Sequence, residues 1–363
     1  MAVLELWRAD LAIPFSYSND ADYYLMLTKG VVAHGWPYVN HDLGVPFGQQ
    51  LYDFAIGGDD LDLLILKLLG LGSHNPFVVT NLFYLASFPL SALSAFAVMR
   101  ALGISRATSA ACAVLYALAP YHFVRGETHL YLSMDFMVPL GAYLVVAIWS
   151  GTPLFRRRAR GRGPLALAST RSLLTVAICA VLASSAELYY AGFVLVLALV
   201  AGLVRGAARL EARSLWTGAG VAVAIAAFAA ANLAPTLAYA SRHGRNPVVA
   251  ERLPQEADAG GLKLAQLLAP VPGHRIEALA RLGASYAWSQ HPETFGTIEQ
   301  PALGTVAAAG FVWLLGVLAM AVVGTERHTR ESIEDLASAV PADARRLLVT
   351  PREAILVVET ARL

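Results

Sequence analysis

The stretch PFVVTNLFYLASFPLSALSAFAVM, residues 76–99, decides the fold of this chain. None of its side chains is charged, and apolar residues occupy most of its positions. The hydrocarbon core of a bilayer is about 30 Å thick, which a helix of about 20 apolar residues crosses. The stretch therefore predicts a transmembrane helix, and several similar stretches follow it along the chain.

The composition agrees with a membrane protein. Hydrophobic residues make up 57% of the chain and charged residues 15%, and the mean hydropathy is +0.55. Soluble domains are about half apolar and about one quarter charged, so this excess of apolar residues predicts lipid as the solvent. A net charge of +1 gives no support to a nucleic-acid partner. Cys112 and Cys179 lie in apolar segments, which argues against a disulfide framework or a metal site built on cysteines.

We expect an all-α fold, a polytopic transmembrane helical bundle of about seven spans whose outer-face loops carry short helices. Between two of the spans the chain carries polar and aromatic residues around Glu187, which favours a tight hairpin over one long helix. The apolar segment 63–72 is too short to cross a bilayer and is expected to lie in the interface or to re-enter. The expected spans are 76–99, 107–124, 130–149, 172–187, 188–204, 216–239 and 303–323.

The basic residues set the expected orientation. The loop FRRRARGRG, residues 155–163, is placed in the cytoplasm because short cytoplasmic loops retain Lys and Arg. This choice puts most of the Lys and Arg residues inside. The expected domains are an outer-face segment at 1–75, a transmembrane domain at 76–323 with an outer loop at 240–302, and a cytoplasmic tail at 324–363.

The two ends of the chain differ from those of a simple multi-pass protein. Residues 1–16, MAVLELWRADLAIPFS, lack the basic region and apolar core of a signal peptide. No span precedes the outer segment, so we expect either that a first helix is missing upstream or that the start codon is misassigned. The charged, amphipathic tail fits either a small cytoplasmic helix pair or part of a longer protein.

A pair of carboxylates, Asp20 and Asp22, lies in the segment SYSNDADYYLMLTKGVVAH, residues 16–34. Apolar residues recur behind the pair at helical spacing, which predicts a helix with Asp20 at its entrance. Two interpretations stand side by side. The carboxylates cap and solvate the positive end of the helix, or they act as a general base or a cation site beside the membrane.

The next stretch, residues 35–62, is rich in Gly, Pro, Asn and aromatic residues, as is typical of a structured loop. Its aromatic and amide side chains suit the faces and hydroxyl groups of a sugar, or they anchor the loop at the membrane interface. Three acids at its end are interpreted mainly as caps of the short helix at 63–72. The candidate substrate-binding residues are Gln49, Gln50 and Tyr52, the neighbouring aromatic residues are Trp36 and Tyr38, and the three acids are Asp59, Asp60 and Asp62.

The spacing of the outer-face acids and histidines does not indicate a metal site. The acids around Asp60 lack the regular oxygen-ligand pattern of a calcium loop. Nothing in the spacing of His34, His41 and Asp42 requires that they meet. We therefore expect no cofactor, and a divalent cation is compatible with the acids but not indicated.

Three further outer positions carry ionisable residues close to the bilayer, where such residues are functional candidates. Arg125 either pairs with Glu127 alone or clamps a phosphate through its planar fork. The candidates for substrate binding are Arg125, Glu127 and His129 between the second and third spans, Glu187 at the tip of the following hairpin, and His274 and Arg275 in the loop at 240–302.

The order of these features resembles the polytopic glycosyltransferases of the GT-C type, which take a sugar from a polyprenyl-phosphate carrier. The resemblance covers roughly residues 10–240 and is strongest in the first 150. The order and topology of the elements carry it, since no single motif is diagnostic. The matching elements are SNDADYYLMLTKGVVAHGW, LGVPFGQQLYDF, NPFVVTNLFYLASFPLSALSAFAVMRALG and YALAPYHFVRGETHLYLSMDFMVPLGAYL.

The resemblance implies an enzyme of the plasma (inner) membrane with its active face outside the cytoplasm. It implies inverting transfer of a hexose or pentose from a polyprenyl-phosphate sugar to a cell-envelope glycan, lipid or protein. In such enzymes an acid of the first outer loop is the general base, which corresponds here to Asp20 or Asp22. A carboxylate of this kind takes the proton of an alcohol and makes it nucleophilic. A cation that receives the lipid phosphate corresponds to Arg125 or Arg275.

Two alternatives to a glycosyltransferase come from other classes. Family members begin with a cytoplasmic end and a first span and have more than seven spans, so a non-catalytic or fragmentary membrane scaffold is one alternative. A transporter or flippase is the other, and it calls for charged residues within spans and for related halves. Here the acids gather at the outer ends of the spans, with Asp135 as the main exception, and no internal repeat is visible.

Overall fold

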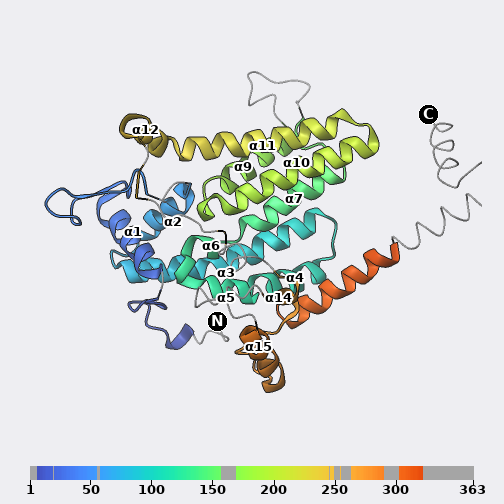
Figure 1. Ribbon diagram of the computed structural model, residues 1–363, viewed down its shortest axis with the longest axis horizontal. Helices are drawn as coiled ribbons and strands as arrows, with labels where there is room; N and C mark the ends of the chain where they lie inside the picture. Colours follow the sequence, from blue (N-terminus) through green and yellow to red (C-terminus); the bar gives the residue numbers. More distant parts are fainter. Residues whose placement is uncertain are drawn as a thin grey trace, which may run out of the picture. The chain divides into compact units, whose positions relative to one another are not determined.

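The structure is a computed structural model in which two compact units make up the chain (Figure 1). One unit comprises Met1–Lys263 with Ala287–Pro301, and the other comprises Leu264–Tyr286 with Ala302–Leu363. The first unit carries the site. The structure describes residues 6–18, 20–54, 58–156, 169–244, 246–248, 254, 263–289 and 302–321.

In the described part of the chain the fold is mostly helical with almost no strand, as the sequence predicts. Among the described residues the only strands are β1 (Val39–Asn40) and β2 (Gln49–Gln50), which pair antiparallel with Val39 opposite Gln50. Four helical stretches are long and apolar enough to cross a membrane. They are α3 (Pro76–Ala101), the run Arg106–Ser133, the stretch Ala186–Arg209 that contains α10 (Tyr189–Arg209), and α11 (Ala212–Asn232).

The expectation of seven spans is not confirmed. Three further apolar helices are shorter: α7 (Met137–Trp149), α9 (Thr170–Leu182) and Thr305–Ala321 of the second unit. A helix rises 1.5 Å per residue, so the 13 residues of α7 or of α9 cover only about 20 Å of a bilayer about 30 Å thick. The predicted tail at 324–363 lies outside the described residues.

Two of the expected spans are interrupted. The predicted span at 130–149 divides into α6 (Leu130–Ser133) and α7, with Asp135 buried between them. The predicted span at 216–239 divides at Leu233 into α11 and α12 (Ala234–His243), which has a proline in its first turn. The break around Glu187 agrees with the expected hairpin. The run Arg106–Ser133 likewise consists of α4 (Arg106–Ala117), α5 (Pro120–Arg125), η2 (Gly126–His129) and α6.

The helix starts follow from local sequence. Asn75 caps α3 by accepting a hydrogen bond from the backbone N–H of Phe77, and Pro76 occupies the first helical position. Ser105 caps α4 in the same way through the N–H of Thr108. Such side chains satisfy N–H groups that the first turn of a helix leaves without an intrahelical partner.

The described part of the first 75 residues packs onto the bundle rather than standing apart from it. It contains η1 (Leu6–Arg8), α1 (Ala21–His34) and α2 (Asp60–Gly70), and both α1 and α2 contact α3. Leu27, Leu66 and Phe83 are fully or almost fully buried in the shared core. The buried Asn81 of α3 donates to the carbonyls of Leu11 and Ile13 at 2.9 and 2.8 Å, which fixes the segment before α1.

Helices α10 and α11 lie side by side, because glycines let their backbones approach closely (Figure 1). A Cβ atom at Gly202 would lie 3.2 Å from the Cα of Gly218 and 2.9 Å from the carbonyl oxygen of Ser214. Small residues at such a crossing are typical of helix pairs in membranes. On its other side α10 exposes Val196, Leu197, Val200 and Leu203, as expected of a helix bordered by lipid.

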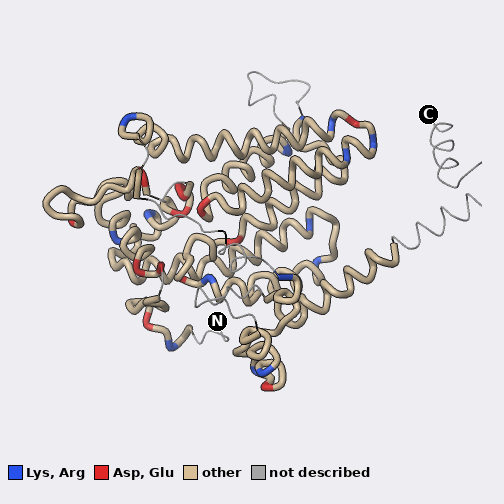
Figure 2. Tube along the Cα trace, viewed as in Figure 1, with Lys and Arg blue, Asp and Glu red and all other residues tan. Residues whose placement is uncertain are grey.

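The charges of the first unit gather at the ends of its helices, and the middle of the bundle carries few (Figure 2). We call the region around the starts of α1, α2 and α10 the acidic end. We call the region where α7 and α10 end and α11 begins the basic end; it carries Arg205, Arg209 and Arg213. The 21 residues of α10 place these ends about 30 Å apart, close to the thickness of a bilayer core.

Candidate functional site

The acidic end is the candidate site, and three segments that are distant in sequence build it. They are the start of α1, the start of α2 and the turn that precedes α10. The shared core beneath them includes Tyr24 of α1, Leu63 of α2 and the buried Tyr131 of α6. Tyr24 and Tyr131 meet edge to face with ring centroids 4.9 Å apart.

The turn before α10 has a strained backbone. Ala186, Glu187 and Leu188 have φ values of 53°, 54° and 64°, so three consecutive residues with side chains adopt the left-handed conformation. Each such residue costs roughly 1–2 kcal/mol. A conformation of this kind persists only when its surroundings impose it, and strain of this type concentrates at functional sites.

Two carboxylates of the α2 region hold the turn. Asp59 Oδ1 accepts a hydrogen bond from the N–H of Glu187 at 2.6 Å, and Asp62 Oδ2 accepts one from the N–H of Ala186 at 3.0 Å. The N–H of Leu61 donates to the carbonyl of Ser184 at 2.8 Å, which adds a backbone link. Asp59 and Asp62 are only 2% and 0% exposed, so both contacts are made by buried carboxyl groups.

Helix α1 reaches the same turn through a tyrosine. The hydroxyl of Tyr24 donates a short hydrogen bond to Glu187 Oε1. Burial raises the pKa of Tyr24, and the charge of Glu187 raises it further, so the phenol remains a proton donor. The side chain of Glu187 is therefore fixed from α1, while its backbone is fixed from α2.

The buried acids favour their protonated forms. Burial raises the pKa of Asp62, and the negative charge of Asp59 raises it further. Burial also raises the pKa of Asp59, against the opposing effect of the hydrogen bond from the Glu187 N–H. Within the part of the chain that the structure describes, Asp62 Oδ1 and the hydroxyl of Tyr131 are buried without a hydrogen-bond partner.

Asp20 and Asp22 have a different environment, because both are exposed. Asp20 is the N-cap residue of α1, yet its side chain makes no capping hydrogen bond. Among the described residues no hydrogen bond or ion pair to its carboxylate is present. Its charge contributes to the raised pKa values of Tyr23 and Tyr24, which places it beside the network around Glu187. The hydrogen bond that the capping interpretation requires of the Asp20 side chain is therefore not present.

The sequence interpretation of the second acidic group needs correction. Asp59 occupies the N-cap position of α2, but its carboxylate makes no capping hydrogen bond and binds the turn before α10 instead. Asp62 binds the same turn, and Asp60 accepts a hydrogen bond from Trp36 Nε1 at 3.3 Å. The cluster of acids was visible in the sequence. Its partner segment lies more than a hundred residues away, and local spacing does not reveal such a contact.

Glu127 lies beside α1, because η2 contacts that helix, and Arg125 is the last residue of α5, directly before η2. The buried carboxylate of Glu127 accepts a hydrogen bond from the N–H of Ser16 at 2.9 Å, so it holds the chain just before α1. The guanidinium of Arg125 lies 5.0 Å from the centre of the Tyr121 ring. His129 is half-buried, and its Nδ1 lies 3.4 Å from the hydroxyl of Thr128.

Tyr52 lies in a stack of aromatic rings. Its ring is parallel to those of Tyr38 and Tyr239, with centroids 4.9 and 5.3 Å away and interplanar angles of 4°. His243 continues the stack against Tyr239 at 4.3 Å. Both faces of Tyr52 are therefore covered, which leaves its edge and hydroxyl for a ligand.

The remaining predicted residues divide between the two units. Gln49 donates from Nε2 to the sulfur of Met26 at 3.7 Å, and Gln50 is exposed on β2. His274 and Arg275 belong to the second unit, where His274 Nδ1 accepts a hydrogen bond from the N–H of Ile276 at 3.0 Å. Among the described residues no three His, Cys, Asp or Glu side chains form a group that could hold a metal ion.

Comparison with known proteins gives no match. No protein-family model matches the chain, and neither the curated proteins nor the solved structures contain a match to it. The geometry of the acidic end is therefore the basis for a proposal about function.

Proposed function

We propose that the chain is a membrane glycosyltransferase that moves a sugar from a polyprenyl-phosphate donor to an acceptor in the cell envelope. Its reaction takes place at the acidic end, which faces away from the cytoplasm in the plasma (inner) membrane. The single observation that carries the proposal is the contrast among the acids there. Asp59, Asp62 and Glu187 are committed to hydrogen bonds, whereas the exposed carboxylate of Asp20 is uncommitted.

An uncommitted carboxylate is the group that this reaction requires. An alcohol is a weak nucleophile until a carboxylate within hydrogen-bond reach takes its proton. Asp20 is accessible to an acceptor hydroxyl, and Asp22 lies in the same first turn of α1. The oxygen of the acceptor then forms a bond to the anomeric carbon as the bond to the lipid phosphate breaks, so the configuration inverts and the phosphate leaves as an anion.

The surroundings of Asp20 support this assignment. The charge of Asp20 acts on the nearby phenols of Tyr23 and Tyr24. Tyr24 is held by its hydrogen bond to Glu187 of the turn at 186–188, and such a fixed group provides a rigid frame for substrate. A lipid phosphate is already a stable anion, so a cation assists its departure more than an acid does. Arg125, held against Tyr121 at the end of α5 and directly before η2, is the cation that we assign to this role.

The test uses the purified full chain and a panel of labelled polyprenyl-phosphate sugars. We expect one donor to be consumed, and Asp20→Asn to lower its consumption by at least about a hundredfold, the usual contribution of a general base. Asp42→Asn is the matched control, because Asp42 is an exposed acid of the same segment paired with His34. Full activity of both Asp20→Asn and Asp22→Asn would contradict the proposal, and so would a lack of consumption of every donor.

A further inference from the structure

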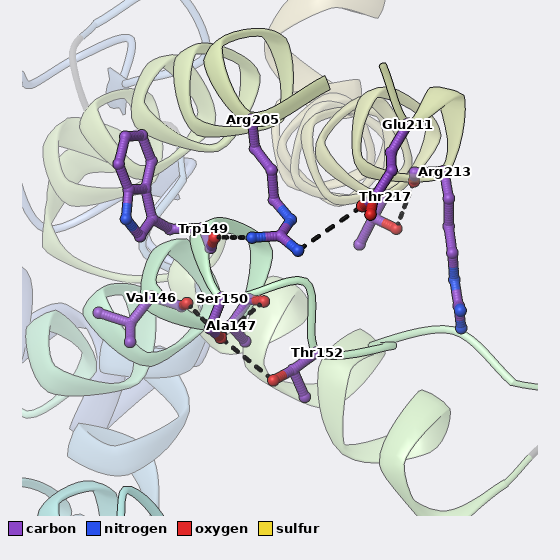
Figure 3. A network of polar contacts seen from close by, with 9 residues as sticks. All are labelled: Val146, Ala147, Trp149, Ser150, Thr152, Arg205, Glu211, Arg213 and Thr217. Atoms are coloured by element: carbon purple, nitrogen blue, oxygen red, sulfur yellow. Dashed lines mark hydrogen bonds and ion pairs between the residues drawn. The ribbon is translucent and has the colours of Figure 1, made fainter. Parts of the chain in front are cut away.

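A polar cavity of about 400 Å³ lies at the basic end, far from the acids of the candidate site (Figure 3). It is formed where the chain leaves α7, where α10 ends and where α11 begins. Its charged and polar lining consists of Thr152, Arg205, Glu211, Arg213, Ser214 and Thr217. The positive side chains outnumber the negative one, so the cavity favours an anion.

Arg205 is built into this cavity. Its Nη1 donates to the carbonyl of Trp149 at 2.7 Å, and its Nη2 lies 3.6 Å from Glu211 Oε2 (Figure 3). Only 21% of its side chain is exposed, and its Nε is buried without a partner among the described residues. Gly151 makes room for the guanidinium, since a Cβ atom there would lie 2.7 Å from Arg205 Cζ and the φ of Gly151 is +72°.

The start of α11 adds further donors. Ala212 is its first residue, and Glu211 at the N-cap position makes no capping hydrogen bond with its side chain. The first N–H groups of a helix have no intrahelical partner, and together with the helix dipole they favour an anion. Arg213 lines the cavity from the same turn. The N–H of Ser214 donates to the carbonyl of Glu211 at 3.1 Å, so the N–H groups of Ala212 and Arg213 are those left without an intrahelical partner. The Arg213 guanidinium combined with such N–H groups is a donor set that phosphate oxygens prefer.

We propose that this cavity binds a phosphate group. Two ligands could supply this phosphate group: a phospholipid headgroup of the adjacent leaflet and free inorganic phosphate. Glu211 is the competing anion, because its carboxylate lies near the guanidinium that the phosphate would approach. Removal of its charge should therefore strengthen binding, while removal of either lining arginine should weaken it.

The test measures binding to the purified full chain in detergent by thermophoresis. The probes are short-chain phosphatidic acid, short-chain phosphatidylcholine and inorganic phosphate. We expect phosphatidic acid to bind at least about tenfold more tightly than phosphatidylcholine, and Arg213→Gln or Arg205→Gln to weaken it about tenfold. Inorganic phosphate that competes equally well identifies the free ion as the ligand, and binding of phosphatidic acid alone identifies the headgroup.

Two further variants distinguish weaker binding from a loss of folding. Glu211→Gln should tighten binding about threefold, a gain that an unfolded protein cannot show. Arg209→Gln is the matched control, because Arg209 is exposed at the end of α10, the helix that carries Arg205, and does not line the cavity. The proposal is overturned if the two lipids bind equally, or if Arg209→Gln weakens binding as much as Arg213→Gln and Glu211→Gln brings no gain.

Discussion

The two ends of α10 use charge in different ways. At the acidic end Asp59 and Asp62 are buried and accept hydrogen bonds from backbone N–H groups, so their carboxyl groups hold a strained turn. At the basic end Arg205 and Arg213 line a cavity, and Arg213 is exposed. Ionisable side chains thus serve the fold at the acidic end, whereas Arg213 remains available to a ligand at the basic end. The exposed Asp20 is the exception at the acidic end, and for that reason it is the residue to which we assign chemistry.

The largest stability effect is expected from Asp59→Ala. The variant removes a buried carboxyl group and leaves the half-buried N–H of Glu187 without its acceptor, which costs roughly 1–3 kcal/mol. The melting temperature in detergent measures the effect. Asp42→Ala is the control, because its exposed pair with His34 should contribute far less. Equal losses in the two variants would contradict a structural role for the buried acids.

The second prediction concerns pH. Burial raises the pKa of Asp59 and Asp62 in the folded protein, so the folded state keeps protons that the unfolded state releases. Their contribution to stability is complete below the pKa of an unfolded aspartate, about 3.9, and is lost as the pH rises through their folded pKa values. Melting temperatures measured from about pH 3.9 upward, through the raised pKa values of the folded protein, should therefore depend less on pH in Asp62→Asn than in the parent protein. An identical pH dependence in both proteins would show that protonation of Asp62 does not cause the pH dependence of the melting temperature.

A smaller gain is expected from Ala186→Gly. A glycine adopts the left-handed conformation without the Cβ penalty, which relieves roughly 1 kcal/mol of strain at a residue with a φ of 53°. The melting temperature should rise slightly. Ala183→Gly is the comparison, because Ala183 is a buried alanine of the same segment with a φ of −84°. A fall of similar size in both variants would show that the turn stores no strain.

The smallest effect is expected at the basic end. Arg209→Gln removes an exposed charge that neither lines the cavity nor contacts the acidic end, so the free energy of unfolding should change by less than about 0.5 kcal/mol. The same melting experiment measures it. A loss as large as that of Asp59→Ala would mean that charge at the basic end also holds the fold, and the contrast between the ends would disappear.

The sequence predicted the class of fold because apolar length is a local signal. The uncharged stretch at 76–99 became α3, and the polar break around Glu187 became the turn before α10. The number of spans could not be predicted from apolar length in the same way. Met137–Trp149 and Thr170–Leu182 are apolar but short, and where a helix breaks depends on its packing as well as on hydropathy.

The candidate site was predictable only in part, since it joins distant segments. Asp20 and Glu187 stood out because ionisable residues beside a membrane are unusual. The links from Asp59 and Asp62 to residues 186 and 187 were hidden, because spacing along the chain contains no information about contacts over more than a hundred residues. The same acids at the start of a helix therefore looked like caps.

The most direct test of this division among the acids compares Asp20→Asn with Asp59→Ala in one preparation. Donor consumption and melting temperature are measured for both variants and for the parent protein. We predict that Asp20→Asn loses donor consumption at an unchanged melting temperature, whereas Asp59→Ala lowers the melting temperature because it removes the acceptor of the Glu187 N–H. Full consumption by Asp20→Asn, or a loss explained by a lowered melting temperature, would contradict the assignment of the chemistry to the exposed acid.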